Sequence, residues 1–458
     1  MTQLSTAASL LGPDGGQTLA SMRAGLAFLT GRPTDQLLAR VGQRIEEIPP
    51  LTPVDKTALQ DSYGGSQTAA CDDLLVGRGL FYLTEQRRLC LDCTSGHYQM
   101  LWGYNPPQLC AAINEAVAAG VVWDNHANIP QTPVKRLAHR LVEAANPPGQ
   151  QDPIDTVLLG CCTGSVACEA ALKMQLVCFE RARRSRSKPV VVVLDGNYHG
   201  TDMVPQYMRG MWRGYVKGLE VATVQPNEAD ELKAVFRRRG RRVAAFWAEP
   251  IMMNREAIPL QPSYLQLARR LCDEAGAIMC FDEIQTGFWQ PEIFAYRAMG
   301  FVPDMVIAGK GMTAGFHPLA AVLYKSRYDV LDQYDAINTN GSAPLASYVG
   351  LCVMDMVAGQ GERLAAVGDR FLGRLSELAE EFGEVVQDAR GKRHLAGLKF
   401  RRVEDALDFH RRAVEAGLWV RVHAYHAGHS TILTKLSLAA DEQIVDFIVE
   451  KFRSLLRS

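Results

Sequence analysis

The sequence predicts an α/β protein with a mostly parallel central sheet in a large domain and a smaller α+β domain. Three observations lead to this fold class. Short apolar runs of strand length alternate with amphipathic helical stretches through the middle of the chain. These runs are apolar at every position, as in strands that are buried on both faces. After Pro344 the alternation gives way to long helical stretches and then to mixed helices and strands. Such an order favours parallel strands covered by helices, followed by a second domain.

The domain boundaries follow from the same pattern. The first fifty residues contain Gly/Pro breaks around one weakly amphipathic helix, which is typical of a peripheral arm. We therefore predict an N-terminal arm with part of the small domain over residues 1–90, a large α/β domain over 91–344, and the remaining small domain over 345–458. The small domain is thus expected to combine N- and C-terminal segments.

The elements are expected in this order along the chain. Strands are predicted in the large domain at Pro189–Leu194, Val243–Ala248, Ile278–Phe281, Met305–Ala308 and Leu319–Tyr324. Helices are predicted there at Ala167–Arg181, Glu228–Arg239 and Ser263–Glu274. Further helices are predicted at Leu345–Ala358, Glu362–Glu381, Val403–Ala416 and Asp441–Leu456, with strands at Leu398–Arg401 and Leu418–Val422. Ligands of such sheets bind beyond the carboxyl ends of the strands.

Composition excludes several classes of function. The 49 basic residues nearly balance the 50 acidic ones, so no net field would attract nucleic acid or a membrane surface. The chain has neither a secretion signal pattern nor an apolar run of membrane-spanning length, which predicts a cytoplasmic enzyme. Eleven scattered cysteines indicate a reducing compartment. Cys90 and Cys93 have a C-x-x-C spacing, but no second pair or histidine cluster accompanies them at the spacing of a zinc site. We expect no metal.

The strongest chemical signal is a carboxylate and an amine at successive strand ends. One apolar run ends at Asp282, and the next predicted strand is followed by Gly309-Lys310-Gly311. Pyridoxal 5′-phosphate (PLP) chemistry needs both groups. A carboxylate keeps the ring nitrogen protonated, and a lysine holds the cofactor as a Schiff base and moves the substrate proton. The flanking glycines would permit tight turns and close approach of the cofactor.

These residues resemble the class III aminotransferases. The stretch from Phe281 to Phe288 (FDEIQTGF), followed by Gly-Lys-Gly, nearly reproduces the pattern of that family, and the resemblance extends from about Leu91 to the C-terminus. It implies fold type I, a PLP cofactor on Lys310, and a hydrogen bond from Gln285 to the phenolic oxygen of the cofactor. Glu249, at the end of a predicted strand, would lie near the active site.

Three further cofactor contacts are implied by the resemblance. Gly164, Ser165 and Val166 open a helix and would hold the phosphate with their backbone N–H groups. Tyr198 would stack on the cofactor ring, with His199 beside it. Thr339 lies in a segment that resembles a family loop reaching the cofactor of the partner subunit. A homodimer is therefore expected.

Two departures from the family pattern bear on the substrate. Met252-Met253-Asn254 replaces the usual Gln-Gly-Glu, and the segment Ile432–Leu438 lacks the arginine that otherwise grips the carboxylate of the donor. Arg421 or Lys435 could replace that arginine, or the substrate could be a bulkier primary amine, amino sugar or aldehyde. An apolar or sugar-stacking wall, or equally core packing, is indicated by Tyr98, Trp102, Tyr104, Trp123 and Trp289.

The function predicted is amino transfer by a ping-pong route, between a primary amine, amino sugar or amino acid and an aldehyde or keto acceptor. A racemase or epimerase would use Lys310 and Asp282 equally well, and phospho-lyases and aminomutases share these motifs. A non-catalytic binding protein is disfavoured because the lysine, the aspartate and the phosphate turn are all present.

Overall fold

A computed structural model describes residues 6–55, 57–58, 73–124, 129–183, 188–424 and 426–457. The chain forms two compact units. The large unit consists of residues 107–366 and 390–395. The small unit consists of residues 1–106, 367–389 and 396–458, and so combines both ends of the chain. Parts of the predicted N-terminal arm, residues 1–5, 56 and 59–72, lie outside the described residues.

The two units divide the chain later than the predicted boundaries at 90 and 344. Strand β3 (Leu89–Asp92) pairs with β2 (Phe81–Thr84) and with β15 (Leu418–Trp419), which keeps the chain up to residue 106 in the small unit. Helix α11 (Pro344–Ala358) packs on helices of the large unit. An apolar helical pattern predicts that a helix is buried, but it does not predict against which unit.

The large unit is built on a sheet of seven strands. Their order is β4-β12-β11-β10-β7-β5-β6. The bounds are β4 Thr156–Cys161, β12 Ala320–Tyr324, β11 Met305–Ala308, β10 Ile278–Asp282, β7 Val243–Ala248, β5 Val190–Leu194 and β6 Glu220–Val224. Strand β12 runs antiparallel to both of its neighbours, and the pairs from β11 to β6 are parallel. The predicted mostly parallel sheet and its five predicted strands are confirmed.

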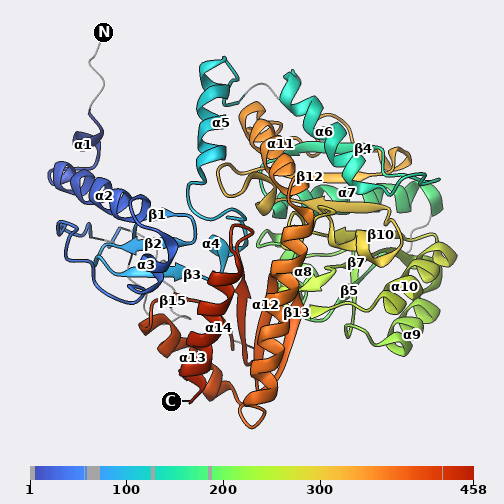
Figure 1. The fold of residues 1–458 in the computed structure, drawn as a ribbon. Helices are drawn as coiled ribbons and strands as arrows, with labels where there is room; N and C mark the ends of the chain where they lie inside the picture. The colour runs from blue at the N-terminus through green and yellow to red at the C-terminus, as the bar shows by residue number, and fades with distance from the viewer. Residues whose placement is uncertain are drawn as a thin grey trace. The chain divides into compact units, whose positions relative to one another are not determined.

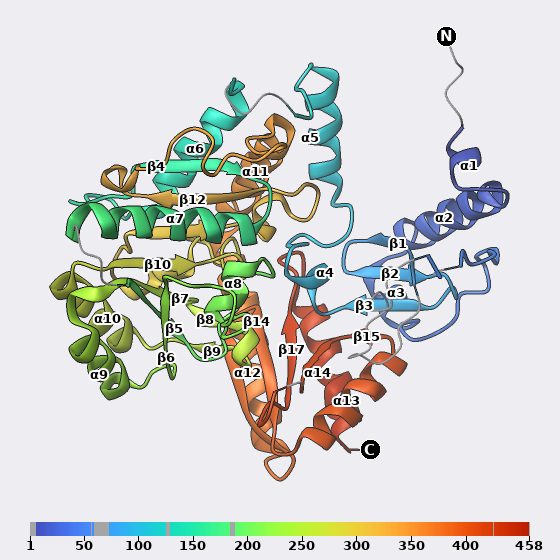
Figure 2. The ribbon, with the colours of Figure 1, turned by 180° about the vertical axis from the view of Figure 1, so that it is seen from behind.

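Helices cover this sheet. They are α5 Pro107–Ala118, α6 Thr132–Ala145, α7 Gly164–Arg183, α8 Met203–Met208, α9 Ala229–Arg239, α10 Pro262–Ala275 and α11. Helix α7 packs along β11 and β12, as Figure 2 shows, and α9 and α10 lie side by side in Figure 1. A small hairpin joins β8 (Ile251–Met252) to β9 (Ile258–Pro259). Within the part of the chain that the structure describes, no helix is both long and apolar enough to cross a membrane.

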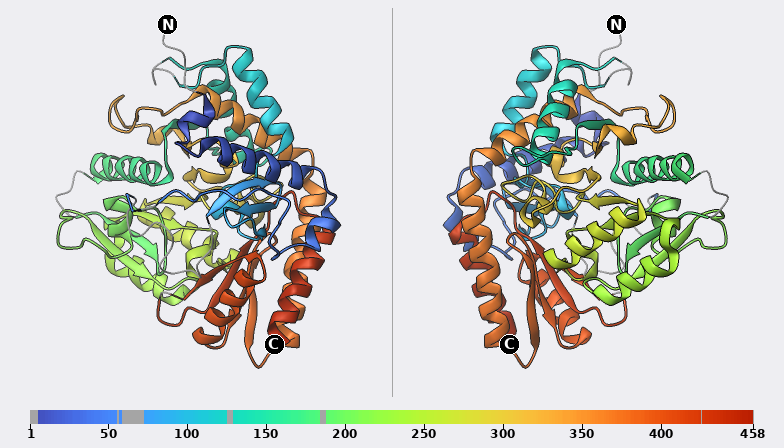
Figure 3. Two further views of the ribbon diagram at one scale, coloured as in Figure 1. Left: turned by 90° about the vertical axis from the view of Figure 1, so that its left-hand side faces the viewer. Right: turned by 90° about the vertical axis from the view of Figure 1, so that its right-hand side faces the viewer.

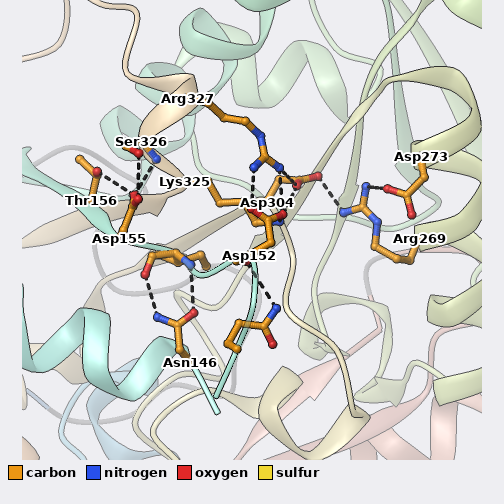
Figure 4. A network of polar contacts seen from close by, with 12 residues as sticks. Asn146, Asp152, Asp155, Thr156, Arg269, Asp273, Asp304, Lys325, Ser326 and Arg327 are labelled. Atoms are coloured by element: carbon orange, nitrogen blue, oxygen red, sulfur yellow. Dashed lines mark hydrogen bonds and ion pairs between the residues drawn. The ribbon is translucent and has the colours of Figure 1, made fainter. Parts of the chain in front are cut away.

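A network of ion pairs surrounds Asp304, the residue just before β11 (Figure 4). Asp304 is buried and accepts hydrogen bonds from Arg269 at 2.7 Å and Lys325 at 3.1 Å, and Lys325 also reaches Asp152 at 2.6 Å. Burial would raise the pKa of the Asp304 carboxyl, but the charges of Arg269 and Lys325 outweigh it and hold the pKa below its ordinary value. The network therefore fixes the start of β11 and the end of β12, which lie at the edge of the sheet opposite the predicted site.

The small unit contains two sheets of four strands. One has the order β1-β2-β3-β15 and the other β13-β14-β17-β16. The remaining bounds are β1 Leu74–Arg78, β13 Val386–Lys392, β14 Leu395–Phe400, β16 Arg421–His423 and β17 Thr431–Lys435. The helices are α1 Ala7–Leu10, α2 Gly15–Thr30, α3 Thr34–Leu38, α4 Ser95–Tyr98, α12 Gly361–Glu381, α13 Val403–Glu415 and α14 Glu442–Arg457. Residues 361–366 of α12, 390–392 of β13 and 395 of β14 belong to the large unit. Figure 3 shows α12 beside α14, where Arg370 pairs with Asp446 and Arg374 with Glu450.

Candidate active site

The carboxyl ends of the parallel strands bring the predicted catalytic residues to one edge of the sheet. Asp282, the last residue of β10, is in register with Ile307 of β11, and Lys310 follows three residues later. Phe281 is in register with Ala248 of β7, so Glu249 comes out beside Asp282. The antiparallel strand β12 begins opposite Cys161, where β4 ends. The sheet thus gathers at this edge the groups that are far apart in the sequence.

A cavity of about 130 Å³ lies at this edge. Its lining residues are Thr163, Gly164, Ser165, Tyr198, His199, Gly200, Ile284, Gln285 and Lys310. Six of them were predicted as site residues, namely Gly164, Ser165, Tyr198, His199, Gln285 and Lys310. Thr163, Gly200 and Ile284 were not predicted to line it. Ile284 lies inside the stretch from Phe281 to Phe288, and Thr163 and Gly200 are each adjacent to a predicted site residue.

Lys310 begins a tight turn, η4 (Lys310–Thr313), and its own backbone is strained. Its φ is +41°, in the left-handed region that favours glycine, whereas Gly309 is extended at −178°. A side chain on Gly309 would meet its nearest atoms at ordinary distances of 3.6 Å. The left-handed residue of the turn is thus Lys310 and not Gly309, and the close approach of the cofactor to the flanking glycines stays a prediction. Helix α11 packs on this turn, and Lys310 Nζ lies 5.9 Å from the centre of the Tyr198 ring.

Asp282 is buried within a group of polar contacts. Its Oδ2 lies 2.8 Å from Nδ1 of His199 and accepts a longer bond of 3.6 Å from the thiol of Cys168. Its Oδ1 accepts the N–H of Ile284 at 3.0 Å. The three potential metal-ligand atoms of Asp282, His199 and Cys168 lie within 4.8 Å of one another. Burial raises the pKa of the Cys168 thiol well above its ordinary value, so the sulfur stays protonated and acts as a donor to Asp282.

Glu249 lies behind Tyr198. Its Oε1 accepts the N–H of Tyr198 at 2.8 Å, and its Oε2 is buried without a hydrogen-bond partner among the described residues. Burial raises the pKa of this carboxyl to about 7, and the nearby Asp282 acts in the same direction. Glu249 therefore holds the backbone of the stacking candidate rather than lining the cavity.

Gln285 and Asn254 form a pair at the other side of the cavity. Nε2 of Gln285 donates to Oδ1 of Asn254 at 3.1 Å, and Oε1 of Gln285 is buried without a described partner. Asn254 is the last residue of the segment that replaces the usual Gln-Gly-Glu. The substitution therefore exchanges a carboxylate for a neutral amide beside Gln285.

The start of α7 faces the same cavity. Ser165 Oγ accepts the N–H of Thr201 at 3.0 Å, and the first N–H groups of an α-helix have no partner within the helix. A Cβ on Gly200, whose φ is +123°, would come within 2.1 Å of Ser165 Oγ. Only glycine allows the loop after β5 to lie this close to α7. Val166, predicted with Gly164 and Ser165, is half-buried and does not line the cavity.

Thr339 lies in a loop that is fixed on strand β4. Asn338 N–H donates to Gly160 at 2.9 Å and Ser342 N–H donates to Leu159 at 2.9 Å. The Thr339 side chain itself is exposed, and it does not line the cavity of its own chain.

The predicted substrate residues are divided between the two units, so their part in this cavity stays a prediction. Tyr98, Trp102, Arg421 and Lys435 belong to the small unit, and Trp123 belongs to the large unit, where 59% of its surface is exposed. Lys435 is fully buried with its amine over the Tyr98 ring, and burial lowers its pKa well below the ordinary value. Arg421 contacts Nδ1 of His97 at 2.7 Å. Trp289 is also fully buried, which is the core packing left open as an alternative.

The cavity fits PLP on observations of this structure. An amine, a flat aromatic ring and a helix start all face it. Two buried polar atoms beside it, His199 Nε2 and Gln285 Oε1, have no described partner. Buried polar groups of this kind are normally satisfied, so their presence indicates a polar occupant or water. A buried carboxylate, Asp282, lies behind the lining residue His199.

Comparisons with known proteins agree with this geometry. The family model described as aminotransferase class-III matches residues 74–456. The acetylornithine aminotransferase of Xylella fastidiosa is 30% identical over 341 residues, 71% of this chain and 79% of that protein. A protein of Pseudomonas aeruginosa named succinylornithine transaminase/acetylornithine aminotransferase is 28% identical, over 70% of this chain and 77% of that protein.

Solved structures show the same fold at lower identity. A transaminase from the marine bacterium Virgibacillus has a TM-score of 0.75 at 19% identity, covering 89% of this chain and 96% of that chain. The N-acetylornithine aminotransferase of Stenotrophomonas maltophilia has a TM-score of 0.67 at 24% identity, covering 86% and 97%. The fold is therefore fold type I. The chain belongs to the class III aminotransferases, PLP-dependent enzymes that move an amino group between small-molecule amines and keto compounds.

Proposed function

We propose that this aminotransferase takes a terminal amino group, one that is not adjacent to a carboxylate, from its donor, with Lys310 and Asp282 as catalytic residues. One observation carries the choice of donor. Lys310 is the sole lysine or arginine among the nine described residues that line the cavity. The carboxylate of an α-amino acid would lie within a few bonds of the reacting carbon, and none of the other eight lining residues is a lysine or arginine that would offset its desolvation. A terminal amine avoids that cost.

Lys310 has two tasks in this proposal. Its amine would hold the cofactor covalently until the donor amine displaces it, and its Nζ would then take the proton from the carbon that bears the amino group. The bound cofactor supplies an electron sink for the electron pair that this proton leaves behind. The strained backbone of Lys310, packed under α11, would aim Nζ at the cavity.

Asp282 would keep the ring nitrogen of the cofactor protonated. His199 and Cys168 both face its Oδ2, and the N–H of Ile284 faces its Oδ1. These contacts would hold the carboxylate in place. His199 acts through Asp282, so it is a positioning residue.

The other cofactor contacts follow from the lining. Gly164 and Ser165 would bind the phosphate with the N–H groups at the start of α7. Tyr198 would stack on the ring, held by the bond from its N–H to Glu249. The Gln285 amide would donate to the phenolic oxygen, with Asn254 fixing its orientation.

Two findings support the donor class. The curated relatives reported above are named for acetylornithine and succinylornithine. Many family members carry an acid at the position of Asn254, and this acid pairs with the arginine that binds the donor carboxylate. This chain has neither the acid nor an arginine in Ile432–Leu438. The absence of both residues supports a different way of recognising the donor.

A homodimer is part of the proposal. Thr339 would reach the phosphate bound by the partner subunit, because its loop is held rigidly on β4 while its side chain is exposed. Mixing Lys310→Ala protein with Thr339→Ala protein tests this. Mixed dimers would contain one site with both defects and one intact site, so activity should return on mixing. No return, or a monomer in solution, would contradict the dimer.

The first experiment on function follows the absorbance of the bound cofactor during a single half-reaction. The donors are alanine, pentylamine and 5-aminopentanoate, with the Lys310→Ala variant as the control that should not react. Conversion to the aminated cofactor by the two terminal amines, at a rate well above that with alanine, supports the proposal. Conversion by α-amino acids alone would overturn it.

A further inference from the structure

An arginine outside the predicted motifs lies against the ring that borders the cavity. Arg209 follows directly after helix α8, and its guanidinium carbon lies 5.0 Å from the centre of the Tyr198 ring. Lys310 Nζ lies 5.9 Å from the centre of the same ring. The two cationic groups are therefore no more than about 11 Å apart. Arg209 is half-buried, so its charge is only partly screened by water.

Arg209 differs from the other arginines around β5 and β6 in its partners. Arg255 pairs with Asp195 at 3.1 Å, and Arg242 pairs with Glu220 at 2.7 Å. Arg209 has no ion pair with a carboxylate among the described residues, and its recorded side-chain contact is the face of Tyr198. A guanidinium on an aromatic face keeps its N–H groups at the edge, where they remain available for a planar anion.

The two cations predicted for this task are engaged within the small unit. Lys435 is fully buried over Tyr98 with a lowered pKa, which favours its neutral form. Arg421 is occupied by His97. Arg209, in contrast, lies against a residue that lines the cavity and has no carboxylate partner among the described residues.

We propose that Arg209 is the specificity-determining residue of the substrate site and binds a carboxylate at the far end of the donor, away from the transferred amine. This inference rests on the proposed function and deepens it. An extended chain advances roughly 1.2 Å per bond, and an ion pair adds about 4 Å. Within the limit of about 11 Å, the carboxylate lies no more than about six bonds from the transferred nitrogen. The donor class is therefore a short ω-amino acid or a derivative that keeps its carboxylate.

The test compares two donors that differ only in the carboxylate, 5-aminopentanoate and pentylamine. Arg209→Gln should raise the KM for 5-aminopentanoate by about 10- to 100-fold, the usual worth of a charge-assisted hydrogen bond. It should change the KM for pentylamine by less than about twofold, because that amine makes no contact with the guanidinium. Arg209→Lys should keep part of the effect, since it keeps the charge but loses the fork.

A binding measurement separates this inference from the proposed function. Pentanoate cannot donate an amino group, so its affinity for the holoenzyme, measured by calorimetry, does not depend on catalysis. That affinity should fall by a similar factor in Arg209→Gln and stay unchanged in Arg238→Gln, an exposed arginine on α9 that serves as the charge-matched control. If wild type reacts only with α-amino acids, the proposed function fails while pentanoate binding still reports on Arg209.

Three results would overturn the assignment of Arg209. An equal loss with both amines would mean that it acts through Tyr198. A loss of PLP affinity in Arg209→Gln would place the guanidinium on the phosphate of the cofactor. Unchanged KM values and unchanged pentanoate affinity would remove Arg209 from the site altogether.

Discussion

His199 Nδ1 lies 2.8 Å from Asp282 Oδ2, and both side chains are almost completely buried. The imidazole is itself packed edge-on against Trp247, whose indole N–H donates to Gln175 at 2.8 Å. The orientation of the carboxylate is therefore set by a chain of buried groups rather than by solvent. Partners of this kind tune a functional group without touching the substrate.

The first prediction separates the two members of this pair. Asp282→Asn should lower kcat by at least about 100-fold, because the neutral amide no longer favours a protonated ring nitrogen. His199→Asn should lower kcat by only about tenfold and shift the pH profile of kcat. Steady-state kinetics between pH 6 and 9 measure both. A His199→Asn variant with an unchanged profile would make the contact merely structural.

The second prediction concerns the amine at the strained turn. Lys310→Ala should lower kcat by about 1,000-fold or more while the fold survives, since alanine keeps the Cβ of lysine and leaves the backbone strain at φ +41° unchanged. Adding a small primary amine such as methylamine should restore part of the activity. Full activity in the variant would show that Lys310 is not the proton carrier.

The third prediction uses the raised pKa of Glu249, about 7 against an ordinary 4.5. The folded chain favours the protonated carboxyl, so the stability that it contributes is complete below pH 4.5 and is lost as the pH rises through 7. The difference amounts to about 3 kcal/mol. Urea unfolding of cofactor-free protein at pH 5 and pH 8 should show a smaller pH-dependent loss in Glu249→Gln. The exposed Glu292→Gln should behave like wild type.

The fourth prediction concerns the close approach of the loop after β5 to α7. Gly200→Ala should weaken PLP binding, because its Cβ would displace Ser165. Gly149 also has a positive φ, +76°, but a Cβ there would meet open space. Gly149→Ala should therefore cost only the backbone strain of about 1 kcal/mol and leave the PLP affinity unchanged. Equal PLP affinities in the two variants would contradict the assignment.

The fifth prediction concerns the ion-pair network of Figure 4. Asp304→Asn leaves Arg269 and Lys325 facing a neutral amide, and it should destabilise the fold by about 3 to 5 kcal/mol. The pKa of Asp304 is lowered in the folded chain, so its contribution is present at neutral pH and is lost as the pH falls. Chemical unfolding at pH 7 and pH 3, the latter below the ordinary pKa of 3.8, should show a difference between variant and wild type that shrinks at the lower pH.

Sequence predicted the central strands well because each is apolar on both faces. Strands β7 and β11 have the predicted bounds, and β10 extends the prediction by one residue to Asp282. Strand β6 was not predicted, since Glu220–Val224 is an edge strand with mostly half-buried residues and a weak apolar signal. The strands β1 and β2 form a local antiparallel pair and were not predicted either.

The site was predictable where its chemistry depends on residue type and not where it depends on packing. Lys310, Asp282, Tyr198 and Gln285 could be singled out from motifs. The left-handed backbone of Lys310, the contact of Cys168 with Asp282 and the position of Arg209 on Tyr198 each arise from how separate elements meet. No spacing in the sequence encodes those approaches.

The parallel pairing of β3 with β15 joins Leu91 to Leu418 across most of the chain. During synthesis the N-terminal strands of the small unit are made long before the strand that completes their sheet. Contacts between such distant segments carry a high entropic cost of loop closure and form slowly. The small unit can therefore complete its structure only after nearly the whole polypeptide has left the ribosome. Truncation before residue 418 removes β15, the edge strand of its first sheet, and leaves β3 unpaired on that side.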